Sequence, residues 1–428
     1  MTARLLTVAL VAGALAWTTA LIARSADTAP SPDPAPSVAA TASDAPERPR
    51  SDRLRPGTPE EAGMHPATTA RIDAVMDWAI DTGAFPGAAL VVGRGGVLVE
   101  RRGFGRLTPG GPRATPSTPY DLASLTKVVG TTTALMRLVE RGQVDLDAPV
   151  RRYLPSFDPV GQTRPVRVRH LLEHTAGQRP WMPFYALGIL DRDAALAWIH
   201  RDTLRTRPGA TVRYSDFDMI LLGEIVERVT GLSLDRAVAM LVTEPLGMDA
   251  TRFRATGTVD ASAAPTETDT YWRMRTLRGE VHDEAASVMG GVAGHAGLFS
   301  TADDLARFAY LYTQRGRAYG VRLFRPATLR RFTRRIPARG DYDMALGWMR
   351  VPRGRDLRHA AGVAVGPQTY GHTGYTGTSI WIDPETELFI VLLTNRVHPS
   401  RANNRIRDVR ARLHTAIAAS VVPGSEAP

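Results

Sequence analysis

Two β-hairpin signals, one near each end of the 428-residue chain, constrain its fold most strongly. The first joins residues 88–92 to residues 97–101 through a glycine-rich turn, and the second joins residues 380–382 to residues 388–394 around Asp383-Pro384-Glu385. Aliphatic runs separated by Gly, Pro or Asp turns are typical of antiparallel strands. Because the two pairs lie at opposite ends of the chain, we expect one sheet built from both chain ends.

The sequence between the hairpins has a largely helical pattern. Apolar residues at helical spacing, bounded by capping residues or glycine, predict helices over residues 122–141, 169–174, 191–201, 218–229 and 302–313. Folded structure is expected to begin near Thr58-Pro59-Glu60-Glu61, which resembles a helix start. The predicted fold class is therefore α/β (α+β), an antiparallel sheet from both chain ends flanked by helices, with an inserted and mostly helical region.

The first 56 residues differ in composition from the rest. Arg4 precedes an uncharged run over residues 5–22 and a small-x-small site at Ala23-Arg24-Ser25, which is the outline of an export signal. The run is long for a signal-peptide core and short for a comfortable membrane span, so cleavage after residue 25 and membrane attachment through residues 5–22 both stay open. Residues 26–56, rich in Ala, Pro, Ser and Thr, predict a disordered linker. We expect an exported protein that is periplasmic, extracellular or anchored on the outer side of the cytoplasmic membrane.

The remaining chain predicts one domain over residues 57–420, with the sheet in residues 57–122 and 340–420 and the helical part in residues 123–339. The absence of cysteine from the sequence excludes disulfides, thiolate metal sites and a cysteine nucleophile. The net charge of +10 accompanies no recognisable nucleic-acid-binding motif, so no nucleic-acid partner is expected.

Lysine occurs once in the chain. Of 53 Lys and Arg residues, 52 are arginines, and the exception, Lys127, follows Ser124 by three residues. Arginine stays protonated at any biological pH, whereas a desolvated lysine can lose its charge and accept a proton from a neighbouring hydroxyl. Near a helix start, side chains at i and i+3 share a face, and unpaired backbone amides favour developing negative charge. A serine nucleophile needs this arrangement, although a surface lysine beside a serine would show the same spacing.

Further motifs occur in the order found in one known family. Ser124-Leu125-Thr126-Lys127 matches S-x-x-K, Tyr214-Ser215-Asp216 occupies the Y-x-N position, and His372-Thr373-Gly374 occupies the K-T-G position. With these motifs, the chain resembles the serine β-lactamase and penicillin-binding protein superfamily, particularly its class C-like branch of esterases and D-amino-acid-releasing peptidases. The resemblance spans roughly residues 57–415 and implies a β-lactamase/DD-peptidase-like fold.

The resemblance implies a role for each matching residue. Ser124 would attack a carbonyl and form an acyl-enzyme, while Lys127 and Tyr214 share the proton transfers, and which of them is the acylation base stays open. The backbone amides of Ser124 and Tyr375 would form the oxyanion hole, next to Thr373-Gly374 on a substrate-binding strand edge. The expected partner is a small acyl substrate or a cell-wall peptide, and no cofactor or metal is expected.

Two substrate-binding positions depart from the family pattern. Asp216 replaces an amide side chain, so at neutral pH it accepts hydrogen bonds but donates none, and it favours the charged form of a nearby Lys127. His372 replaces a lysine that would hold a substrate carboxylate by charge. Both changes predict an esterase or D-Ala-D-Ala carboxypeptidase-like enzyme rather than an efficient β-lactamase.

Two alternatives belong to other functional classes. His170-Leu171-Leu172-Glu173-His174 fits H-x-x-E-H, in which two histidines bind zinc and a glutamate activates a water molecule, but no third ligand can be identified in the sequence. The chain could also be a catalytically silent binding protein of β-lactamase-like fold, although its serine and lysine are both present.

Overall fold

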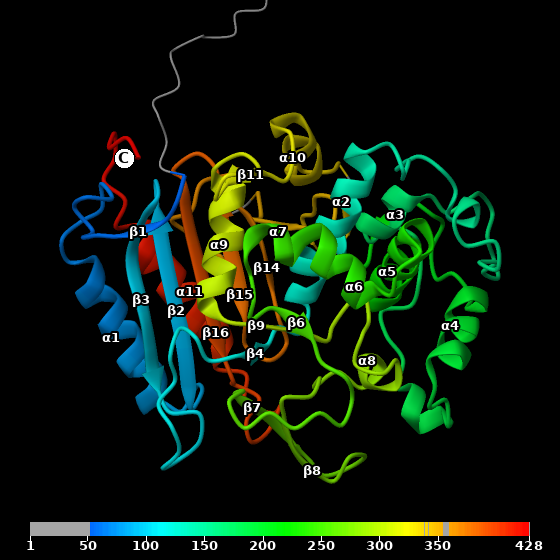
Figure 1. The fold of residues 1–428 in the computed structure, drawn as a ribbon, viewed down its shortest axis with the longest axis horizontal. Helices are drawn as coiled ribbons and strands as arrows, with labels where there is room; N and C mark the ends of the chain where they lie inside the picture. The colour runs from blue at the N-terminus through cyan, green and yellow to red at the C-terminus, as the bar shows by residue number, and fades with distance from the viewer. Residues whose placement is uncertain (1–51, 338, 341, 354–358, 428) are drawn as a thin grey trace, which may run out of the picture. The chain divides into compact units, whose positions relative to one another are not determined.

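The computed structural model describes residues 52–337, 339–340, 342–353 and 359–427 (Figure 1). The predicted export signal and almost all of the predicted linker lie outside these residues. Within the described residues, no helix is both long enough and apolar enough to cross a lipid bilayer.

A seven-stranded sheet built from both ends of the described chain forms the centre of the fold (Figure 1). Its strand order is β1-β3-β2-β16-β15-β14-β13, and all neighbouring strands are antiparallel except β1 and β3. The strands are β1 Arg55–Pro56, β2 Gly87–Arg94, β3 Val97–Gly105, β13 Met349–Arg350, β14 Tyr370–Thr373, β15 Ser379–Asp383 and β16 Leu388–Thr394. Both predicted hairpins are confirmed, and β16 pairs with β2 so that the two chain ends meet in mid-sheet.

Helices pack on both faces of this sheet. Alternate residues of β2 point to opposite faces, so that Leu90 joins one buried cluster and Val91 the other. Helices α1 (Thr68–Asp81) and α11 (Ile406–Ala418) cover the Leu90 face, and α9 (Ala302–Thr313) covers the Val91 face (Figure 1). Burial on both faces explains why β2 reads as a continuous apolar run rather than an alternating one.

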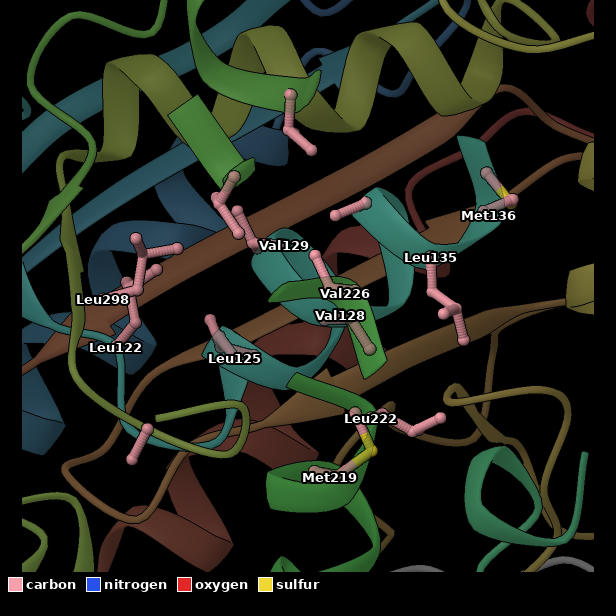
Figure 2. Packing of buried hydrophobic residues seen from close by; sticks show 14 of the residues in the cluster. Leu122, Leu125, Val128, Val129, Leu135, Met136, Met219, Leu222, Val226 and Leu298 are labelled. Carbon is pink, nitrogen blue, oxygen red and sulfur yellow. The ribbon is translucent and has the colours of Figure 1, made fainter. Parts of the chain in front are cut away.

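A pair of packed helices lies at the centre of the inserted region. The π-helical stretch η1 (Lys127–Thr132) continues directly into α2 (Thr133–Glu140), and both pack against α5 (Asp216–Thr230). Figure 2 shows residues of this buried contact, among them Val128 of η1 and Leu222 of α5. This packing brings the start of α5 close to the start of η1.

The remaining helices and strands belong mainly to the inserted region. These are α3 Val168–Leu172, α4 Arg192–Arg201, α6 Leu234–Val238, α7 Glu244–Leu246, α8 Glu284–Val288 and α10 Pro326–Thr333, the short helical turns η2 Val150–Arg152, η3 Phe184–Leu187 and η4 Ala239–Thr243, and the short strands β4 Tyr120–Asp121, β5 Thr211–Val212, β6 Arg252–Phe253, β7 Pro265–Asp269, β8 Arg275–Arg278, β9 Leu298–Ser300, β10 Arg317–Ala318, β11 Val321–Arg322 and β12 Arg339–Gly340. Helices α4 and α9 match their predicted ranges closely, and α5 is longer than its prediction.

Three predicted helix boundaries are wrong. The segment at Thr58 forms a single turn, because Gly63 adopts a φ of 63° and Pro66 follows soon after, and α1 begins only at Thr68. The helix expected from residue 122 starts after Ala123, whose φ is 46°, and the helix expected to reach residue 174 ends at Leu172, because His174 has a φ of 53°. Positive φ angles are incompatible with a right-handed helix. Alanine and histidine, the residue types at positions 123 and 174, do not predict a positive φ.

Candidate active site

Ser124 lies in a tight turn between β4 and the helix that carries Lys127. Ala123, immediately before it, has a φ of 46°, an uncommon conformation for a residue with a side chain. The Asp121 carboxylate accepts the N–H of Ala123 at 2.8 Å and the N–H of His282 at 2.7 Å. Two hydrogen bonds to one buried carboxylate therefore hold the strained turn, and with it the backbone position of Ser124.

The Lys127 ammonium has three polar partners within 3.2 Å, and the Tyr214 hydroxyl is a further neighbour. Its Nζ lies 2.9 Å from Ser124 Oγ, 2.7 Å from Asp216 Oδ1 and 3.2 Å from the backbone carbonyl of His295. The side chain of Lys127 is completely buried. The spacing of S-x-x-K thus places the amine against the hydroxyl, and the packing of α5 on η1 places the Asp216 carboxylate against the same amine.

Opposing effects act on the pKa values of this group. Burial alone would lower the pKa of Lys127, but the Asp216 carboxylate and the Tyr214 hydroxyl outweigh it and raise that pKa above its usual value. Removal from water and the charge of Asp216 raise the pKa of Tyr214, although Lys127 and Ser124 act in the opposite direction. The Tyr214 ring also packs over Lys127, with 4.9 Å from Nζ to the ring centroid. At neutral pH the site therefore holds an ammonium beside a neutral phenol.

The turn between β14 and β15 lies against the Ser124 turn. Thr376 Oγ1 donates to the carbonyl of Asp121 at 2.7 Å, and Thr378 Oγ1 donates to the carbonyl of Leu122 at 2.9 Å. Among the described residues, no hydrogen-bond acceptor is found for the amide N–H of Ser124 or of Tyr375. Both amides thus remain available for a developing oxyanion, as the predicted oxyanion hole requires.

Gly374 and Arg410 fix the backbone of that turn. A Cβ on Gly374 would lie 2.4 Å from the carbonyl oxygen of Leu122, so the close approach of the two turns requires glycine. The buried Arg410 of α11 donates to the carbonyls of Gly374 at 2.8 Å and of Thr378 at 2.6 Å. Sequence reasoning missed Arg410, since a basic residue in an amphipathic C-terminal helix carries no signal for this contact.

The structure places the predicted substrate-binding residue His372 in the interior. Its side chain is completely buried, Nδ1 lies 2.8 Å from the carbonyl of Thr373, and the ring lies 5.9 Å from the Tyr214 ring. Burial and the nearby Lys127 charge lower the pKa of His372 to about 3. The imidazole is therefore neutral at pH 7, while Thr373, next to it, is partly exposed.

A cleft of about 780 Å³ opens in front of Ser124. Exposed aromatic side chains line its outer part, with Trp181, Tyr271 and Tyr375 exposed by 59%, 45% and 50%. Among the described residues, the one guanidinium in its lining belongs to Arg401, which bonds Glu267 at 2.5 Å and Glu284 at 2.8 Å. This arginine could not be picked out of 52 from the sequence, because only the fold places it in the cleft.

The zinc alternative is not supported by the geometry. His174 lies beyond the end of α3 in a left-handed conformation, so it does not share a helix face with His170. The Nδ1 of His170 accepts the N–H of Arg167 at 3.1 Å, and the Nδ1 of His174 lies 3.3 Å from Asp218 Oδ2. In the described part of the chain, neither histidine belongs to a group of three side chains that could share a cation.

Comparisons with known proteins agree with this architecture. The β-lactamase family model matches residues 69–414. A protein of Salmonella typhimurium (strain LT2), named "Putative D-alanyl-D-alanine carboxypeptidase", is 35% identical over 386 residues, which cover 82% of this chain and 88% of that protein. Among solved structures, "EstCE1, a hydrolase with promiscuous acyltransferase activity" is 24% identical with a TM-score of 0.64, over 80% of this chain and 98% of the other.

A second solved structure is the β-lactamase/D-alanine carboxypeptidase from Pseudomonas syringae. It is 18% identical with a TM-score of 0.67, over 83% of this chain and all of that one, and at such identities both structures show a shared fold alone. The family model and the curated relative establish more, since each covers most of the chain. The chain therefore belongs to the β-lactamase family, whose members are serine hydrolases.

Proposed function

We propose that the protein hydrolyses esters or amides through an acyl-enzyme on Ser124, and that it prefers substrates without a carboxylate next to the scissile bond. The observation that supports this substrate preference is that the cationic side chains around the cleft are already paired with protein carboxylates. Lys127 lies 2.7 Å from Asp216, Arg401 is bonded to Glu267 and Glu284, and His372 is neutral. A substrate carboxylate would have to displace one of these partners and would lose much of its electrostatic benefit.

The proposed chemistry uses groups already in contact. Ser124 Oγ would attack the carbonyl carbon, and the amides of Ser124 and Tyr375 would stabilise the negative charge that develops on the carbonyl oxygen. Water would then release the acyl group by the reverse proton transfers. Nothing in this sequence of steps requires a metal or an organic cofactor.

The name of the curated relatives suggests a second substrate. A peptide ending in D-Ala-D-Ala carries a carboxylate beside the scissile bond, so we expect this chain to cleave it more slowly than a neutral ester. Its recognition would require Arg401 to exchange a protein carboxylate for the carboxylate of the peptide.

Export is a separate part of the proposal. Arg4, the uncharged run over residues 5–22 and the Ala23-Arg24-Ser25 site support it. Fractionation of cells that express the full chain, with N-terminal sequencing of the product, tests export and cleavage together. A full-length product in the cytoplasm would contradict both.

The activity is tested with p-nitrophenyl butyrate, nitrocefin and a D-Ala-D-Ala peptide. We expect the highest kcat/KM for the ester, together with covalent labelling by a serine-reactive phosphonate. Ser124→Ala is the matched control, and it should lose both turnover and labelling. Faster turnover of nitrocefin than of the ester would overturn the preference and leave the serine mechanism standing.

A further inference from the structure

The Lys127 ammonium has three direct acceptors within 3.2 Å, in addition to the Tyr214 hydroxyl beside it. Its three N–H groups are directed to Ser124 Oγ, Asp216 Oδ1 and the carbonyl of His295. A protonated amine has three donors and no lone pair. In this arrangement Nζ can accept the Ser124 proton only if one of its own hydrogens leaves.

Only one of the three acceptors is able to take that hydrogen. Ser124 Oγ is the proposed nucleophile, and the carbonyl of His295 is a very weak base. The Asp216 carboxylate, at 2.7 Å, is the shortest of the contacts and becomes a neutral acid on protonation. Asp216 also has no ion pair among the described residues other than that with Lys127.

The other titratable groups around Lys127 favour the same assignment. Tyr214 hydrogen-bonds to Lys127 and Ser124 but is a neutral phenol, because burial raises its pKa. Burial also keeps His174 and His372 neutral. Asp283 faces the same space, and one polar atom of each of Asp216, Asp283 and His295 lies within 4.8 Å of the others. Asp283, however, bonds to His295 Nε2 at 2.8 Å and makes no direct contact with Lys127.

We propose that Asp216 is the terminal proton acceptor of the acylation step, acting through Lys127. The Nζ hydrogen that faces Asp216 moves to Oδ1, the neutral amine then rotates about its Cε–Nζ bond so that its lone pair faces Ser124, and the Ser124 hydroxyl proton moves to Nζ, so that Lys127 again carries three hydrogens. The Oγ electron pair forms the bond to the carbonyl carbon, and the carbonyl π pair moves to the oxygen. When the tetrahedral intermediate collapses, the bond to the leaving group breaks, and the proton returns from Asp216 through Lys127 to that group.

This role explains why the site tolerates an aspartate at a position where the related motif has an asparagine. An amide oxygen accepts a hydrogen bond from Lys127 but cannot take its proton. In the Asp216→Asn variant, Lys127 would have to lose a proton to solvent before it could act as a base. Turnover in that variant should therefore follow the ionisation of Lys127, whereas wild-type turnover should not.

The single lysine of the chain gives a direct measurement. Protein grown with lysine labelled with ¹³C at Cε gives one signal, and its chemical shift reports the protonation of Nζ. We expect an ammonium in wild type throughout the pH range in which p-nitrophenyl butyrate is hydrolysed. In Asp216→Asn, kcat/KM should be at least about ten-fold below wild type wherever Nζ is charged, and should recover only where Nζ is neutral.

Two further variants make each outcome decisive. Asp283→Asn removes a nearby carboxylate without direct contact, and Nζ should remain an ammonium in it. Tyr214→Phe tests the competing base. A loss of 100-fold or more in that variant, with an unchanged unfolding midpoint, would assign the proton to Tyr214 and overturn the proposal, whereas a loss below about ten-fold supports it.

Two other results would also overturn the proposal. One is wild-type rate in Asp216→Asn while Nζ is still an ammonium, and the other is a wild-type Nζ that titrates together with kcat/KM. The proposal rests on Ser124 as nucleophile, and phosphonate labelling of Ser124 checks that assumption separately. Failure of labelling would therefore be distinguishable from failure of the relay.

Discussion

The inner and outer parts of the cleft are built in different ways. At the inner end Lys127 and His372 are completely buried, and Lys127 Nζ and His372 Nδ1 each have neighbours at hydrogen-bond distance. At the outer end Trp181 and Tyr271 are about half exposed, and Arg401 is only partly buried. Electrostatic interactions are strong in the dry interior and weak in water, so the inner end determines the reaction and the outer end can change with substrate.

The largest effect should follow from removing the proposed nucleophile at the inner end. Ser124→Ala is expected to lower kcat/KM for p-nitrophenyl butyrate by about four orders of magnitude or more. The variant should fold normally, because it removes a hydroxyl rather than a packed apolar group. The check is steady-state kinetics together with thermal unfolding, and full activity in a folded variant would end the serine mechanism.

The next largest effect should come from Lys127. Lys127→Arg is expected to lower kcat/KM by about three orders of magnitude, nearly as much as Lys127→Ala, because a guanidinium keeps the charge but does not transfer a proton. The planar guanidinium group also cannot reproduce three hydrogen bonds that all start from one nitrogen atom. Near-normal turnover of Lys127→Arg would show that Lys127 contributes only its positive charge. That result would contradict the proposed proton relay.

As the pH falls, the free energy of unfolding should decrease because of the buried histidines at a higher pH than the one at which the ion pairs of the outer cleft break. Burial lowers the pKa of His372 to about 3 and the pKa values of His170 and His414 to about 4, against about 6.5 in an unfolded chain. Between these values the unfolded chain binds protons that the folded protein does not, so the stabilisation is complete above pH 6.5 and is lost as the pH falls. Burial opposes the charge of Glu267, but its bonds to His282 and Arg401 hold its pKa at about 2, so the Arg401 pair survives to lower pH.

Urea unfolding at pH 7.5 and pH 5 measures this effect. We expect a loss on the order of 1 kcal/mol per buried histidine for each pH unit below about 6. His414→Gln is the matched control, and it should reduce the pH dependence by roughly the share of one histidine while leaving Ser124 labelling intact. Equal unfolding free energies at the two pH values would show that these imidazoles are not held neutral in the folded protein.

The smallest effect is expected at the outer end. Glu284→Gln removes one carboxylate partner of Arg401 and leaves Glu267 in place. The kcat/KM for a D-Ala-D-Ala peptide should rise relative to p-nitrophenyl butyrate by about ten-fold, equivalent to one charge-assisted hydrogen bond at most. Adding Arg401→Gln should abolish the gain. If the ratio of kcat/KM for the peptide to kcat/KM for the ester is unchanged in a folded Glu284→Gln variant, a substrate carboxylate does not reach Arg401.

The sequence was most informative where function depends on local spacing. Ser124 and Lys127 lie three residues apart, so a helix places them on one face. The hairpins at both chain ends follow from aliphatic runs separated by turn residues. Both signals depend only on residues a few positions apart. Helix boundaries were less predictable, as at Ala123 and His174, because those backbone angles are imposed by contacts with distant segments. Asp121, for example, holds the Ala123 turn together with His282, a residue far along the chain.

The sequence by itself pointed to the Ser124–Lys127 pair that is proposed to react, predicted the sheet built from both chain ends and contains no thiol. Only the tertiary structure decided how charge is distributed around the pair. It buried His372, placed Asp216 against Lys127, joined Arg401 to Glu267 and Glu284, and set Arg410 beneath the β14–β15 turn. These contacts join elements far apart in the chain, and electrostatic energies depend on distance and burial, which a residue's identity does not specify.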